Sequence, residues 1–245
     1  MANLVQLGML ERLDAFLLVD KPVGLSFATV VKSVKRKFNL VKVGHGGSLD
    51  ASASGLLVLL INDANKFVGD VMGADRTYEG VLRLGLATNT GDIHGERTGG
   101  GDAAAVTAES LAAAAREFTG DIFQTESRFC SIRREGSADY AIADTGEHAP
   151  FMAHVYRLTF GEISAPDAEG FRRVPFALSC TKGVLPRMIA SDLGTALGCG
   201  AVLESLRRLK VGKYDVADAV PFDRLLETDI KDFTSCVVPL TQALR

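Results

Sequence analysis

The sequence predicts an α+β fold, in which strands and helices share the chain without strict alternation. Three observations lead to this class. Apolar runs of strand length recur along the chain, segments with helical periodicity lie between some of them, and glycine-rich loops separate the two. With 245 residues, of which 47% are apolar and 23% charged, the chain can bury a sizeable core.

Strands are predicted where short apolar runs end at turn residues. The last two runs are joined by a segment that resembles a hairpin connection. The predicted strands cover residues 15–19, 56–61, 77–84, 155–160 and 174–180.

Helices are predicted where apolar residues recur at helical spacing after a capping residue. Ser26 and Thr107 are suitable N-caps, Asn62 fits the start of another helix, and Gly73 fits its end. The predicted helices cover residues 26–38, 62–73, 107–118 and 186–197, and one or two short helices follow residue 221.

The helix at 26–38 carries basic residues at 32 and 35–37, largely outside its apolar stripe. A solvated helix face is one interpretation of these charges. A patch that contacts phosphates is the other, because Lys42 and His45 follow at once. The net charge of −3 does not exclude nucleic acid, since a local basic stripe is sufficient.

The most informative stretch is the glycine-rich loop at 44–55, which contains Asp50 and leads into an all-apolar strand. An aspartate in such a loop fits a turn or cap residue. It also fits a covalent nucleophile, provided that a cation holds it ionised and oriented. Lys21, Lys182 and Arg187 are the candidate cations, and spacing alone does not choose among them.

Other classes of site find little support in the sequence. An HGG segment at 45–47 occurs in some hydrolases, but the G-x-S-x-G elbow and a late histidine are missing. The four cysteines are widely spaced and indicate buried thiols in a reducing compartment, with no metal site. We find no signal peptide or membrane-length apolar run, so we expect a cytoplasmic protein. We expect a monomer, because no long exposed apolar stripe requires a partner.

Six ordered motifs resemble the TruB-type tRNA pseudouridine synthases, over about residues 15–225. Residues 17–26 (LLVDKPVGLS) resemble the family's LLLDKPxGxSS, and residues 44–55 (GHGGSLDASASG) resemble its GHTGxLDPxATG. The remaining matches are residues 76–78 (RTY), 84–95 (LGLATNTGDIHG), 180–187 (CTKGVLPR) and 192–208 (DLGTALGCGAVLESLRR).

The resemblance implies a pseudouridine synthase fold, with a mixed or antiparallel central sheet flanked by helices. It also implies conversion of uridine to pseudouridine, at position 55 in the tRNA T-arm, without metal or cofactor. Asp50 would be the nucleophile on a flipped-out base, Tyr78 would stack on that base, and Arg187 would pair with Asp50. Attack on the sugar, attack on the base and proton abstraction by Asp50 are all open.

Further residues would bind the RNA or support the site. By the resemblance, Lys21 would support the active site, Leu206 would pack near the base, and His45 would hold the opened loop of the RNA. The basic residues Lys182 and Arg207, which belong to two of the motifs, are further candidates.

An insertion at 127–153 would contact RNA, and in it Arg133 and Tyr140 fit the family pattern, although several basic positions are not basic here. We therefore expect one catalytic domain, 1–245, without a C-terminal domain of PUA type.

Two departures lie in the catalytic loop, where the family's proline is Ala51 and its threonine is Gly46. With the altered insertion, they leave two alternatives to the main hypothesis. One is a catalytically weak or silent protein that binds or folds RNA. The other is a uridine isomerase with a different RNA target.

Overall fold

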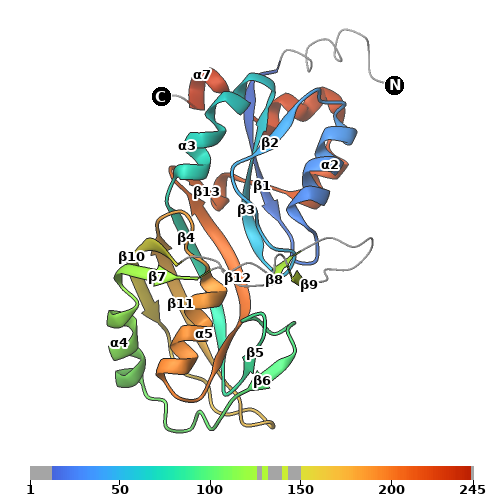
Figure 1. Ribbon diagram of the computed structural model, residues 1–245. Coiled ribbons are helices and arrows are strands. Elements are labelled where there is room, and N and C mark those ends of the chain that lie inside the picture. Colours follow the sequence, from blue (N-terminus) through green and yellow to red (C-terminus); the bar gives the residue numbers. More distant parts are fainter. Residues whose placement is uncertain (1–12, 126–128, 132–139, 143–149, 244–245) are drawn as a thin grey trace. The chain divides into compact units, whose positions relative to one another are not determined.

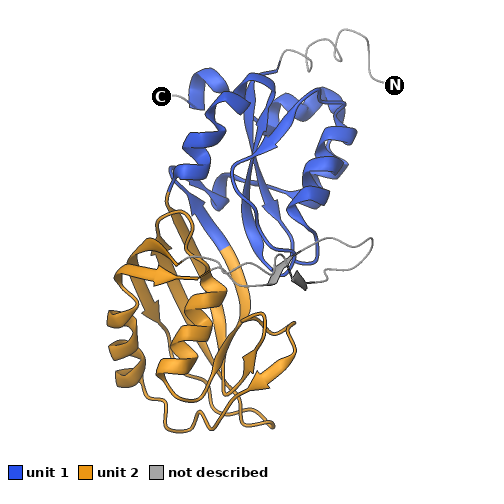
Figure 2. Cartoon of the chain, viewed as in Figure 1, with its two compact units in different colours: residues 1–74, 208–245 blue, residues 75–207 orange. Residues whose placement is uncertain are grey.

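The computed structural model describes residues 13–125, 129–131, 140–142 and 150–243, with only the backbone described for the two short middle segments. Contacts divide the chain into two compact units, which Figure 2 shows in different colours. Unit 1 comprises residues 1–74 and 208–245, and unit 2 comprises residues 75–207. Strand β12 (Ala201–Val211) begins in unit 2 and ends in unit 1.

Unit 1 is built on two long central strands, β1 (Ala15–Lys21) and β3 (Ser54–Ile61). The other elements of its first segment are α2 (Phe27–Lys37), β2 (Val43–His45), the 3-10 helix η1 (Asn62–Phe67) and α3 (Val68–Gly73). Its second segment holds β13 (Tyr214–Asp215), η2 (Val216–Asp218), β14 (Val220–Pro221), α6 (Phe222–Glu227), η3 (Ile230–Cys236), β15 (Val238–Pro239) and α7 (Leu240–Ala243).

The sheet of unit 1 is mixed and has helices on both faces. Strand β1 pairs antiparallel with β3 along its whole length and parallel with β14. Alternate residues of β3 point to opposite faces, so Leu57 and Leu59 pack toward α2 and α6, whereas Leu56 and Val58 pack toward α3. Burial on both faces explains why this strand is a continuous apolar run (Figure 1).

Helix α2 begins as the sequence predicts. The Ser26 side chain accepts a hydrogen bond from the Thr29 backbone N–H at 3.1 Å, which caps the first turn. Val30, Val34 and Phe38 are buried against the sheet. The basic residues stay on the outer side of the helix.

The helix predicted at 62–73 is wrong in detail. Asn62 has a φ of +48° and does not cap a helix, and the segment forms η1 followed by the short α3. The Asn65 amide donates to Leu60 O and Asn62 O, both at 2.9 Å, and this tightens the first turns. Gly73 is the last residue of α3 rather than its cap, and Met72 is 47% exposed.

Unit 2 contains a sheet in the order β12, β4, β11, β10, β7. Its elements are β4 (Arg76–Leu84), β5 (Ala87–Thr88), β6 (Arg97–Gly99), α4 (Ala108–Glu117), β7 (Gly120–Gln124), β8 (Phe129–Ser131), β9 (Tyr140–Ile142), β10 (Phe151–Phe160), β11 (Arg172–Cys180) and α5 (Pro186–Ala196). Strands β10 and β11 form the predicted hairpin. Strand β4 pairs antiparallel with β11 from residue 76 to residue 84.

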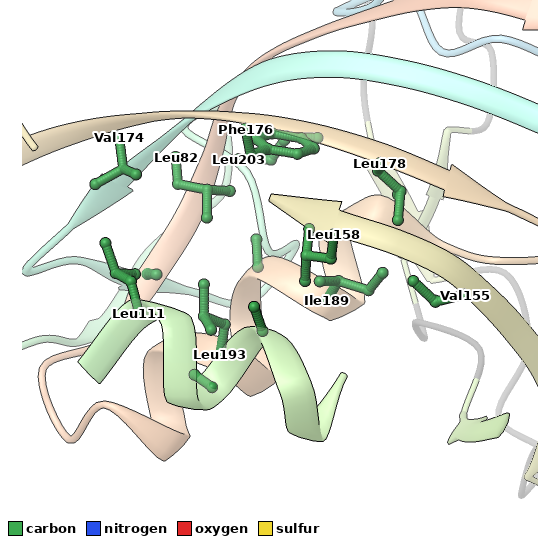
Figure 3. Close-up of a cluster of buried hydrophobic side chains, with 14 of the residues drawn as sticks. Leu82, Leu111, Val155, Leu158, Val174, Phe176, Leu178, Ile189, Leu193 and Leu203 are labelled. Carbon is green, nitrogen blue, oxygen red and sulfur yellow. The ribbon is translucent and has the colours of Figure 1, made fainter. Parts of the chain in front are cut away.

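Helices α4 and α5 cover one face of this sheet and close its core (Figure 3). Leu111 on α4 and Ile189 and Leu193 on α5 point toward the strands. They pack there in one cluster with Leu82 and Phe176. The α+β class and most predicted strands and helices are thus confirmed. No helix in the described part of the chain is long and apolar enough to cross a membrane.

Candidate active site

Asp50 lies in the loop between β2 and β3, and short backbone contacts shape that loop. Gly46 N–H donates to Val58 O at 2.8 Å, so the loop starts tight against β3. Ala53 N–H then donates to Asp50 O at 3.1 Å, which closes a turn around the aspartate. The Asp50 side chain is partly exposed and can meet a substrate.

Two glycines of this loop are required by their neighbours. A Cβ at Gly46 would lie 2.2 Å from Val71 Cγ1, which explains the absence of the family's threonine at this position. Gly55 has a φ of +102°, and its Cβ would lie 2.3 Å from Arg208 O. The loop therefore fits closely between α3 and β12.

Lys21 is a buried cation of unit 1 that interacts electrostatically with Asp50. Its side chain is fully buried, and Nζ donates to Pro22 O and Leu25 O, both at 2.8 Å. Burial lowers the pKa of Lys21 from 10.5 to about 8, while the Asp50 carboxylate opposes this shift and Arg208 adds to it. Because Lys21 has no exposed surface, we expect it to influence Asp50 through its charge and not to contact a substrate.

Arg208 contacts the loop that carries Asp50, and the sequence did not single it out. It is 2% exposed, and its guanidinium donates to Leu56 O at 2.8 Å, Ser48 O at 2.9 Å and Gly47 O at 3.3 Å. The sequence singled out Arg207, which is only partly exposed. No sequence signal distinguishes Arg207 from Arg208, because successive residues of a strand point to opposite faces and either one could point toward the core.

His45 ends β2 and packs against α2. Its ring centroid lies 4.7 Å from that of Phe27, at an interplanar angle of 51°. Burial lowers the pKa of His45, the Gly47 backbone raises it, and Arg208 lowers it further. The lowered pKa favours the neutral imidazole, and its buried Nδ1 forms no hydrogen bond of good geometry with the described residues.

Arg187 is held at the start of α5 by the loop that follows β5. Its Nη1 donates to Thr90 O at 3.2 Å and lies 4.0 Å from Asp92 Oδ2. Asp92 is 2% exposed and also accepts hydrogen bonds from Thr90 Oγ1 at 2.9 Å and from His94 N–H at 3.0 Å. The pairing of Arg187 with Asp50 stays a prediction. Asp92 was missed, although it stands in one of the quoted motifs.

The remaining predicted residues of unit 2 differ in their exposure. Tyr78 on β4 is 7% exposed, and its ring belongs to the core of the unit. Lys182 is exposed in the turn before α5, and Leu206 on β12 is partly buried against the same core.

Two predicted residues belong to the insertion. Arg133 lies outside the described residues, and Tyr140 is described only as backbone in β9. Their predicted contacts with RNA are therefore untested. No group of three or more metal-ligating side chains occurs in the described part of the chain.

The chain matches two family models. Residues 35–185 match the N-terminal domain of the TruB family of pseudouridylate synthases. Residues 187–245 match the C-terminal domain of tRNA pseudouridylate synthase B.

Curated relatives and solved structures agree with these matches. The chain is 40% identical over 216 residues to tRNA pseudouridine synthase B of Burkholderia pseudomallei (strain 668), covering 87% of this chain and 69% of the relative. It is 36% identical over 215 residues to the protein of the same name from Methylobacillus flagellatus, covering 88% and 70%.

Solved structures show the same fold. The protein resembles a chain of a Cbf5-Nop10-Gar1 complex, with a TM-score of 0.72 and 22% identity over 97% of this chain and 63% of the other. A chain of the archaeal box H/ACA Nop10-Cbf5 complex gives a TM-score of 0.69 and 23% identity, also over 97% of this chain and 63% of the other.

The predicted fold, family and enzyme class are confirmed by these likenesses. The glycine-rich loop, the strand β3 that follows it and the strand β12 that carries Arg208 all fall within the matched residues. The chain belongs to the TruB family of pseudouridylate synthases.

Proposed function

We propose that this protein isomerises a uridine to pseudouridine in tRNA, at position 55 of the T-arm, with Asp50 as the nucleophile. The observation that carries the proposal is a partly exposed Asp50 in a tightly held loop, next to the buried charge of Lys21. Membership of the TruB family supports the reaction, and relatives named tRNA pseudouridine synthase B support the substrate.

The chemistry follows from the two nucleosides. The bond between N1 and C1′ breaks, and a bond between C5 and C1′ forms. The hydrogen on C5 leaves as a proton, and N1 gains a proton, so atoms and electrons balance without a redox partner. An aspartate carboxylate fits this exchange because it can form and release a covalent bond. The reaction proposed here uses no metal or cofactor.

The target base must leave its stack before Asp50 can reach it. Extrusion costs a few kcal/mol, which contacts to the base and backbone offset. In this proposal the core of unit 2 fixes the ring of Tyr78, which stacks on the base, and Leu206 packs near it. Arg187, fixed by Asp92, supplies the second cation of the site. His45, whose pKa is lowered by burial, packs beside the opened loop of the RNA.

Basic side chains outside the loop supply phosphate contacts. None of the five cations on α2 and the loop after it forms an ion pair with a described acidic residue; they are Lys32, Lys35, Arg36, Lys37 and Lys42. Elsewhere, Lys66, Lys210 and Lys231 each pair with an aspartate. Uncompensated charge favours the phosphate-contacting interpretation of α2, with Lys182, Arg207 and Arg133 as further contacts.

The experiment is to incubate the protein with an unmodified tRNA transcript and to map pseudouridine chemically. Tritium placed on uridine C5 gives a rate, because each turnover releases it to solvent. Product at position 55 is expected. Absence of product at micromolar enzyme would refute the proposed activity, and product at another position would refute the target. A cytoplasmic monomer is part of the proposal, and sedimentation tests the oligomeric state.

A further inference from the structure

The Arg208 side chain donates hydrogen bonds to three carbonyls that lie outside its own strand, β12. Its guanidinium reaches the carbonyls of Gly47 and Ser48 in the catalytic loop, and that of Leu56 in β3. Asp50 lies two residues after Ser48, in the turn that the same loop makes before it enters β3. One side chain therefore binds the chain on both sides of the aspartate.

The sheet explains why this arginine is in position. Strand β1 occupies one edge of β3, and β2 pairs with the other edge at residues 59–61. Strand β12 follows along that second edge, with the backbone of Arg208 directly beside Gly55. The loop emerges between β2 and β12, so a side chain from β12 can cross its base.

Burial distinguishes Arg208 from a residue that binds RNA, and its charge acts inside the protein. It is 2% exposed, so its side chain offers no surface to a phosphate. Burial is the main cause of the lowered pKa of both Lys21 and His45, and the charge of Arg208 adds to it in each case. A planar guanidinium with several donors suits a role that joins three carbonyls, whereas a lysine ammonium presents a compact point charge.

We propose that Arg208 is a positioning residue, which holds Asp50 in its reactive place by clamping the catalytic loop to β3. The proposal rests on the proposed function for its catalytic part. Arg208 contacts the loop and not the substrate, so it affects the reaction through the position of Asp50.

The test compares three variants of the full chain. Arg208→Met removes the clamp, and Arg208→Lys keeps the charge but loses the planar fork. Arg172→Met is the matched control, because Arg172 in unit 2 also donates to three carbonyls, those of Ser164, Ala103 and Val106. Pseudouridine formation is measured per folded molecule, at a temperature where all three variants are native.

For Arg208→Met we expect kcat to fall about 100-fold, with the KM for tRNA within about threefold of wild type, because misplacing a catalytic group by 1 Å has this size of effect. The kcat of Arg208→Lys should lie between those of the wild type and of Arg208→Met. Arg172→Met should lose stability but keep its kcat. An unchanged kcat in Arg208→Met, or an equal loss in Arg172→Met, would overturn the proposal. If Arg208→Met does not fold, a wild-type kcat in Arg208→Lys overturns it.

Hydrogen exchange tests the clamp without turnover. The amide of Ala53 is bonded to Asp50 O, and its exchange should accelerate in both Arg208 variants and remain slow in Arg172→Met. Unchanged protection in the Arg208 variants would refute the clamp. A wild-type protein that forms no pseudouridine would instead refute the proposed function, and the exchange result would still decide whether Arg208 holds the loop.

Discussion

The contact between Gly55 and Arg208 gives a prediction whose size follows from the geometry. In Gly55→Ala the new Cβ would lie 2.3 Å from Arg208 O, whereas ordinary contacts begin at 3.4 Å. Strands β3 and β12 would have to separate by about 1 Å, and overpacking of this kind costs about 1–3 kcal/mol. The φ of +102° adds about 1–2 kcal/mol for an L-residue. We expect the free energy of unfolding to fall by about 2–5 kcal/mol.

Gly120→Ala separates the two contributions. Gly120 has a φ of +95°, and no atom lies within 4 Å of its added Cβ, so only the backbone cost of about 1–2 kcal/mol remains. Urea unfolding of both variants measures the difference. Pseudouridine formation per folded molecule should fall only in Gly55→Ala, because only there does the strand beneath the loop move. Equal stability losses together with an unchanged rate would refute this reasoning.

Three further predictions concern charge and capping. Burial lowers the pKa of Lys21 from 10.5 to about 8, so between these values the unfolded chain keeps a proton that the native chain releases. The free energy of unfolding should therefore rise with pH above 8, by at most about 1.4 kcal/mol per pH unit relative to Lys21→Met. Activity should fall over the same range, because the charge beside Asp50 is lost. A difference in unfolding free energy between wild type and Lys21→Met that does not change with pH would contradict the burial argument. Asp92→Asn removes the carboxylate 4.0 Å from Arg187 and should lower kcat on the order of 10–100-fold in the tritium-release assay, with wild-type activity counting against a role for this pair. Thr107→Ala removes the side-chain cap that accepts the Ser110 N–H at 3.2 Å and should cost about 1 kcal/mol in urea unfolding without altering kcat.

Strand prediction succeeded where burial leaves an unmistakable pattern. The run at 56–61 is apolar throughout because β3 is covered on both faces, and 15–19 belongs to β1 beside it. The segment 62–73 has equally good helical periodicity but folds as two short helices. There the local hydrogen bonds of Asn65 and the left-handed backbone of Asn62 outweigh the periodicity.

The candidate site residues stay predictions, and they could be named where a motif carries them. Asp50 and Arg187 stand in motifs whose order along the chain is specific. The burial of Lys21 and the clamp by Arg208 depend on which strand lies beside β3, and neighbouring strands need not be neighbours in sequence. The assignment of residues 1–245 to one catalytic domain and the RNA contacts of the insertion stay predictions.

The central claim is that Asp50 performs the isomerisation. Asp50→Asn keeps the size and polarity of the side chain but removes its charge and nucleophilicity. We predict that the wild type converts the uridine at position 55 of an unmodified tRNA, and that Asp50→Asn binds the same tRNA with similar affinity and yields no detectable pseudouridine. Turnover by Asp50→Asn at the wild-type rate would contradict the account.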